Sequence, residues 1–176
     1  MLFVTFIERL SLWAGRLAAL LVVPLVLAMV YEVLSRYVFG RPTLWAFELS
    51  YMMMGTIFLL GIAYALSIGQ HVNVDFIHDA LPKRVVAVID LLGYLVLTGM
   101  TAWIALALFR YFGDAYRSGE GSGLSAWNPP VWPYRFIFGA GFALFALQAL
   151  AKALENALVA LGLTPPPVTA HQEPQL

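Results

Sequence analysis

Four long apolar runs separated by polar segments dominate the pattern of the chain. They cover about residues 10–31, 49–68, 85–109 and 132–161. Each is long enough for a transmembrane helix, which needs about 20 mostly apolar residues. Backbone groups inside lipid must be satisfied within the structure, and these Leu- and Ala-rich runs lack the short alternating segments of a barrel. The pattern predicts an all-α integral membrane protein with four transmembrane helices, joined by short interfacial segments.

The domain organisation follows from the same pattern. Residues 1–163 are expected to form a single four-helix membrane domain, followed by a flexible tail at 164–176 that contains three consecutive prolines. The first run starts near a basic residue, as a signal peptide does. No small-residue cleavage motif precedes the charged segment at 32–41, so we expect this run to be retained as a helix.

Composition narrows the class of function. The chain is 61% hydrophobic and 11% charged, whereas soluble domains are about 45–50% apolar and roughly 25% charged. It has no cysteine, which excludes a disulfide scaffold and thiolate metal sites. Its formal net charge is zero, so it has no basic footprint for nucleic acid. The basic residues divide equally between the two sides, and their count does not decide the topology.

Six ionisable residues in or next to the runs lie near expected helix ends, where long side chains are expected to reach water. They are Arg16, Glu32, Glu48, Asp90, Lys152 and Glu155. The second run has no charged residue between Leu49 and Ile68. An ionisable group deep in the membrane is the usual sign of a transport pathway. Its absence argues against an ion-coupled carrier that acts alone.

The first connection, Glu32–Thr43, and the residues after it form the densest polar cluster. Glu32 and Arg36 are spaced i, i+4 and would share a helix face. Thr43 is a plausible N-cap, and Glu48 falls early in the next helix, where the helix dipole favours an anion. One interpretation is an interfacial segment with Tyr37 and Trp45 in an aromatic belt. The other is a polar clamp onto another membrane subunit.

The second connection, residues 69–84, contains His71, Asp75 and His78. On a helix these three would share a face and could ligate a metal. The apolar positions alternate instead, which favours an extended interfacial loop, and Pro82 then restarts the chain into the third helix. We therefore expect no metal site and no cofactor. Haem would need paired histidines deep in facing helices, which the chain lacks.

The third connection, residues 110–131, is first rich in Gly and Ser and then aromatic and proline-rich, and Trp132 follows it. Trp127, Pro130 and Trp132 either anchor the fourth helix at the membrane surface or form a rigid lip for a partner outside the membrane. Pro133 suits a first helical turn.

The fourth run contains a stripe of small residues at three- and four-residue steps. The stripe comprises Gly139, Ala143, Ala146, Ala149, Ala153, Ala157 and Ala160. Small residues let helix backbones approach closely in lipid. The stripe therefore predicts a helix-packing face.

Residues of the first two connections also occur in an order typical of one family. They are Glu32, Arg36-Tyr37, Phe39, Pro42, Trp45 and Glu48, then Gly61 and Gly69-x-His71-Val72-x-Val74-Asp75. The set resembles the small membrane subunit, DctQ-like, of tripartite ATP-independent periplasmic (TRAP) transporters. Gln148 and the segment from Trp127 to Pro133 are similar to one branch of that family. The resemblance covers residues 10–161.

The resemblance implies a four-helix, non-enzymatic scaffold in the bacterial inner membrane, with both termini cytoplasmic. A much larger polytopic subunit would hold the transport and sodium sites. A soluble periplasmic binding protein would deliver an organic acid, and sodium entry would drive uptake. The branch is associated with monocarboxylates and 2-oxo acids.

The resemblance also suggests roles for single residues. The candidates for contact with the large subunit or the membrane interface are Glu32, Arg36, Tyr37, Trp45, Glu48, His71 and Asp75. Trp127, Pro130 and Trp132 are the candidates for periplasmic docking. We expect Glu48→Ala to weaken co-purification with the large subunit.

Other classes of function have less support. A self-sufficient homo-oligomeric transporter or channel needs a polar pathway, which the uncharged second run does not supply. A membrane redox or haem subunit lacks its ligands. A membrane enzyme would need a nucleophile paired with a base at membrane depth, and none is found.

Overall fold

The computed structural model describes residues 2–69 and 82–163. These contain the helices α1 (Leu2–Tyr37), α2 (Ala46–Ser67), α4 (Lys83–Ser118) and α5 (Trp132–Ala160). All four are long and apolar enough to cross a membrane. Within the described ranges no strand forms, apart from an isolated bridge between Gly121 and Pro130. The predicted all-α class with four spanning helices is confirmed.

Two helices extend well beyond their predicted spans. α1 already begins at Leu2 and continues to Tyr37, and α4 continues to Ser118. The predicted connections at 32–43 and 110–131 were therefore too long, because polar residues at a membrane surface can remain helical until a stop signal. For α4 that signal is Gly119, whose φ of 66° is left-handed and whose N–H bonds to Ala115 O at 3.0 Å. The predicted tail at 164–176 lies outside the described residues.

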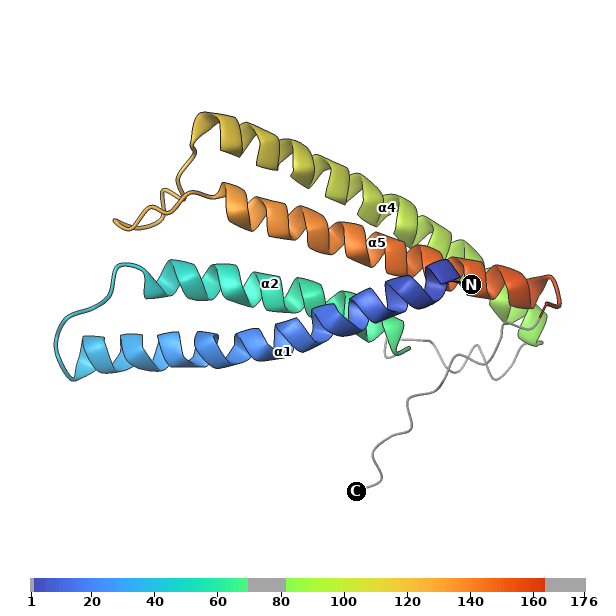
Figure 1. The fold of residues 1–176 in the computed structure, drawn as a ribbon, viewed down its shortest axis with the longest axis horizontal. Helices are drawn as coiled ribbons and strands as arrows, with labels where there is room; N and C mark the ends of the chain where they lie inside the picture. Colours follow the sequence, from blue (N-terminus) through green and yellow to red (C-terminus); the bar gives the residue numbers. More distant parts are fainter. Residues whose placement is uncertain (1, 70–81, 164–176) are drawn as a thin grey trace, which may run out of the picture.

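The helices form two antiparallel pairs in a splayed layer. Figure 1 shows α1 beside α2 and α4 beside α5, with the two pairs converging at one end and diverging at the other. α5 packs along α4 and also contacts α2 and α1. Among the described residues, α4 contacts neither α1 nor α2. α5 is therefore the helix that joins the two pairs.

The two ends of this layer differ. The connections 38–45 and 119–131 meet at the divergent end, where Ser125 Oγ donates to Leu44 O at 3.0 Å. We call this the connection end. The start of α1 meets the last part of α5 at the opposite end, where Glu8 lies 3.9 Å from Lys152. We call this the terminal end.

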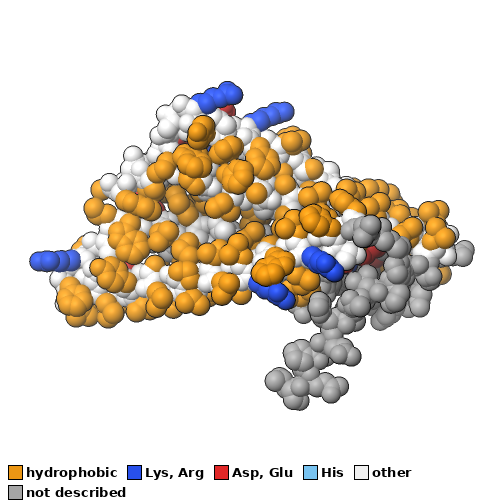
Figure 2. Space-filling model, in the orientation of Figure 1, with side chains coloured by type: hydrophobic (Ala, Val, Ile, Leu, Met, Phe, Trp, Pro, Cys, Tyr) orange, Lys and Arg blue, Asp and Glu red, His pale blue; other side chains and the backbone are white. Residues whose placement is uncertain are grey.

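The core is small and lies where α5 meets α1 and α2. It consists of Ala14, Ala63, Leu66, Leu144, Phe145 and Ala149. Most large apolar side chains of α1 and α4 are exposed, and Figure 2 shows apolar side chains spread over the visible face of the molecule. Such faces are expected where lipid or another membrane protein, rather than water, covers a helix.

Candidate functional site

The carboxylate of Glu32 holds the turn from α1 to α2. It accepts hydrogen bonds from Arg36, whose Nε lies 2.8 Å away, and from both the backbone N–H and the hydroxyl of Thr43. Thr43 N lies 2.9 Å from Oε2. Glu32 is only 8% exposed, and bonds to an ionised group are stronger than those between neutral groups. The predicted sharing of a face by Glu32 and Arg36 is confirmed.

Thr43 also bonds to the start of α2. Its hydroxyl accepts the N–H of Ala46 at 3.3 Å, although the N-cap position belongs to Trp45. The Trp45 ring stacks on Tyr31 of α1, with centroids 6.0 Å apart. Tyr37 is exposed, and half of the Arg36 side chain is exposed. The connection is therefore folded onto α1, while Arg36 and Tyr37 face outward.

Glu48 lies inside the molecule. The expectation that its side chain reaches water is wrong, because the residue is 0% exposed. The physical reason is helical geometry: Leu59 and Leu66 follow Glu48 by nearly whole numbers of turns, so all three lie on the buried face of α2. Neither carboxylate oxygen has a hydrogen-bond partner among the described residues. An unpaired buried charge is costly, and the nearby N-terminus of α2 offsets part of that cost.

Of the second connection, residues 69–84, the structure describes only the two ends, residue 69 and residues 82–84. His71 and Asp75, like His78, lie outside the described residues. Pro82 precedes α4 as predicted, and its carbonyl accepts the N–H groups of Val85 and Val86 at 2.8 and 3.2 Å.

The third connection is a compact folded loop. Val131 N–H donates to Glu120 O and Ser122 N–H to Pro129 O, each at 3.0 Å. The Glu120 carboxylate also binds the Arg135 guanidinium through two bonds of 2.8 Å. This pair fixes the loop onto the first turn of α5.

The loop is also closed internally by Asn128. Gly123 N–H donates to Asn128 Oδ1 at 2.8 Å. A Cβ on Gly121 would lie 2.5 Å from that same oxygen, so a larger residue there would displace the Asn128 side chain.

The three docking candidates of this segment are all exposed in part. Trp127 is 43% exposed, and Pro130 is exposed too. Trp132 is 36% exposed, and its ring also packs against Phe112 and Tyr116 of α4, with centroids 6.3 and 5.6 Å apart. Pro133 lies in the first turn of α5, as predicted.

The small residues of α5 face different neighbours. A Cβ on Gly139 would lie 3.2 Å from Phe109 of α4, whereas one on Gly141 would lie 2.5 Å from Leu59 of α2. Ala146 and Ala153 are buried, and Ala143 is half-buried. Gly141 lies outside the predicted stripe, which assumed a single packing face.

The family model for the DctQ component of tripartite ATP-independent periplasmic transporters matches residues 25–158. That match covers well over half of the chain. The chain belongs to this family. A DctQ-family chain is a small TRAP transporter subunit, and its family is a transporter family rather than an enzyme class.

One relative is the sialic acid TRAP transporter permease protein SiaT of Haemophilus influenzae. It is 29% identical over 80 residues, which are 46% of this chain. The DctQ-family chain spans only 12% of SiaT's length in that match. No solved structure matches the chain.

Sequence reasoning missed the polar contacts between α1 and α5 in the DctQ-family chain. Ser11 Oγ donates to Gln148 Oε1 at 2.8 Å, and both residues are 0% exposed. One turn further along α5, Lys152 Nζ lies 2.9 Å from Glu155 and 3.9 Å from Glu8. The sequence signal that could have indicated this contact is a polar residue, Ser11 or Gln148, within a long apolar run.

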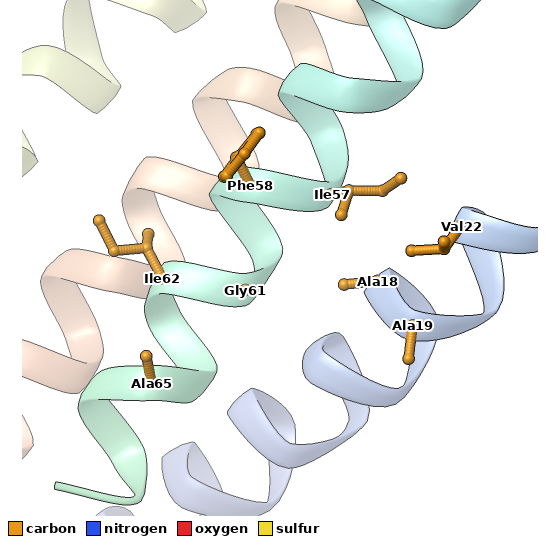
Figure 3. Close-up of a pocket in the computed structure, with 8 residues that line it drawn as sticks. All are labelled: Ala18, Ala19, Val22, Ile57, Phe58, Gly61, Ile62 and Ala65. Carbon is orange, nitrogen blue, oxygen red and sulfur yellow. The ribbon is translucent and has the colours of Figure 1, made fainter. Parts of the chain in front are cut away.

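An apolar groove lies between α1 and α2 (Figure 3). Its volume is about 460 Å³. α1 contributes Ala18, Ala19 and Val22, and α2 contributes Ile57, Phe58, Gly61, Ile62 and Ala65. We refer to it as the α1–α2 groove.

Proposed function

We propose that this chain is the small scaffold subunit of a sodium-coupled, binding-protein-dependent secondary transporter that imports organic acids. It braces a large polytopic subunit and helps to form a periplasmic docking surface for a soluble substrate-binding protein. It lies in the bacterial inner membrane as a single domain, residues 1–163, with both termini and the tail at 164–176 on the cytoplasmic side.

The observation that carries this proposal is the distribution of polar groups in a chain of this family. Apart from Arg16, the charged side chains on the described helices lie toward the ends of their helices. Farther from the ends, the hydroxyls of Thr56 and Thr101 donate to carbonyls of their own helices at 2.9 and 2.7 Å. These hydroxyls carry no charge, unlike the ionisable groups that mark most transport pathways inside membranes. The solute pathway therefore belongs to a partner.

The connection end supplies the proposed contact surface. Glu32 fixes Arg36 in an outward position, and Tyr37 beside it is exposed. The bond from Ser125 to Leu44 holds this connection against the folded loop that exposes Trp127. A surface whose side chains are already ordered loses less entropy when a partner binds.

The test is co-expression with a tagged large subunit, followed by purification in mild detergent. Arg36→Ala should lower recovery of the small subunit several-fold. Arg41→Ala is the matched control, because it removes the same charge from a nearby exposed position, in the 38–45 connection. Equal recovery of both variants would remove Arg36 from the interface, provided that the thermal midpoints of the two isolated chains also agree.

Glu48 is buried, so in this proposal it supports the contact surface indirectly, through the packing of α2. Its replacement by alanine would leave a hole at the start of α2 and should also reduce recovery of the complex. Unchanged recovery would count against a role for Glu48 in assembly. If the purified chain alone moved an organic acid into proteoliposomes, the chain would be a self-sufficient transporter and the scaffold proposal would be wrong.

A further inference from the structure

The α1–α2 groove has a floor of small residues and walls of bulky ones. The space stays open because Ala18, Ala19 and Ala65 have small side chains and Gly61 has none. Phe58 also lines the groove (Figure 3). A Cβ on Gly61 would meet nothing within 4 Å. The groove is therefore open space between two helices, lined by apolar residues as a hydrocarbon chain requires.

The depth of the groove in the membrane follows from the length of α2. Its 22 residues span about 33 Å, close to the thickness of the hydrocarbon core. Ser67, the last residue of α2, therefore marks one membrane surface. Gly15 of α1 lies against Tyr64, less than one turn before that end. The groove starts at this level, with Ala18 and Ala65, and runs toward the middle of the membrane.

A cation lies where the groove approaches the membrane surface. Arg16 precedes Ala19 by three residues and so lies beside it, one turn nearer the surface. Arg16 is exposed, and its guanidinium lies 5.2 Å from the Trp13 ring centre. Arginine and tryptophan are both typical of the interfacial region of a membrane. Arg9, two turns earlier, is exposed as well. Neither arginine pairs with a described acidic side chain.

From this arrangement we infer that the α1–α2 groove binds an anionic phospholipid of the surrounding bilayer. One acyl chain lies in the groove over Gly61, and the phosphate group pairs with Arg16. Charge complementarity selects this occupant: an apolar trough ends at the membrane surface beside Arg16, which pairs with no described acidic side chain, and this matches an anionic headgroup on a hydrocarbon chain. An apolar helix would fill the trough but leave Arg16 without a counter-charge at the edge of the hydrocarbon region.

The experiment measures lipids bound to the purified full-length chain by native mass spectrometry. The chain is mixed in detergent with phosphatidylglycerol or with phosphatidylcholine of the same acyl length. We expect phosphatidylglycerol to be preferred about fivefold, the size of effect of one arginine near an anionic membrane surface. Arg16→Gln should abolish the preference, whereas Arg41→Gln, at the connection end, should retain it.

A second pair of variants tests the groove itself. Gly61→Leu should fill the groove and reduce binding of both lipids several-fold. Gly99→Leu is the matched control, because position 99 on α4 is equally open. The inference is overturned if Arg16→Gln keeps the full preference, or if Gly61→Leu binds lipid like the control. It is also overturned if Gly61→Leu leaves lipid binding intact but abolishes co-purification with the large subunit, since a partner helix would then be the occupant.

Discussion

The contact between Gly141 of α5 and Leu59 of α2 should control how the two helix pairs are joined. A Cβ at position 141 would lie 2.5 Å from both Cγ and Cδ2 of Leu59. Carbon atoms in ordinary contact are about 3.5–4.0 Å apart. Leu59 is only 7% exposed, so it has little room to rotate away. Gly141→Ala should therefore force α2 and α5 apart by about 1 Å.

The expected cost is the balance of two opposing effects. Overpacking a core costs about 1–3 kcal/mol. Replacing a glycine inside a helix with alanine gains about 1 kcal/mol. The net destabilisation is about 0–2 kcal/mol. In a chain of this size, 1 kcal/mol corresponds to roughly 2–4 °C in the thermal midpoint. We expect Gly141→Ala to lower that midpoint by a few degrees in detergent.

The assay is thermal denaturation of the purified chain, followed by size-exclusion chromatography of the remaining folded fraction. Gly99→Ala is the control, because nothing lies within 4 Å of its added Cβ, and its midpoint should stay the same or rise. Adding Leu59→Ala to Gly141→Ala should cost less than Leu59→Ala alone, since the added methyl then fits the vacated space. If Gly141→Ala stabilised the chain as much as Gly99→Ala, the close approach of α2 and α5 would be refuted.

Two polar contacts give further predictions. Ser11→Ala should destabilise the chain by about 1 kcal/mol, because Gln148 Oε1 loses its donor inside the protein, whereas adding Gln148→Leu should recover much of that loss in the same thermal assay. Arg135→Lys should loosen the 119–131 loop, because lysine cannot replace the paired bonds to Glu120, and chymotrypsin should then cleave faster after the exposed Trp127; an unchanged cleavage rate would show that the pair does not restrain the loop.

Hydropathy and the local spacing of residues were enough to predict the number of helices, some local contacts and the family. The four apolar runs fixed the number of spanning helices, because lipid requires long helices with satisfied backbones. The i, i+4 spacing placed Glu32 beside Arg36, and Pro133 correctly indicated the first turn of α5. The order of residues through the first two connections was enough to indicate the DctQ family. These properties depend on length, local geometry and order along the chain.

Only the tertiary structure decided which helix faces meet. Gly139 and Gly141 lie two residues apart on α5 yet approach different helices, so α5 became the helix that joins both pairs. The same arrangement enclosed Glu48 and brought Ser11 of α1 onto Gln148 of α5. Hydropathy reports how deep a residue lies in the membrane but not the direction in which it points. Direction depends on close packing between segments distant in sequence, and no local pattern encodes it.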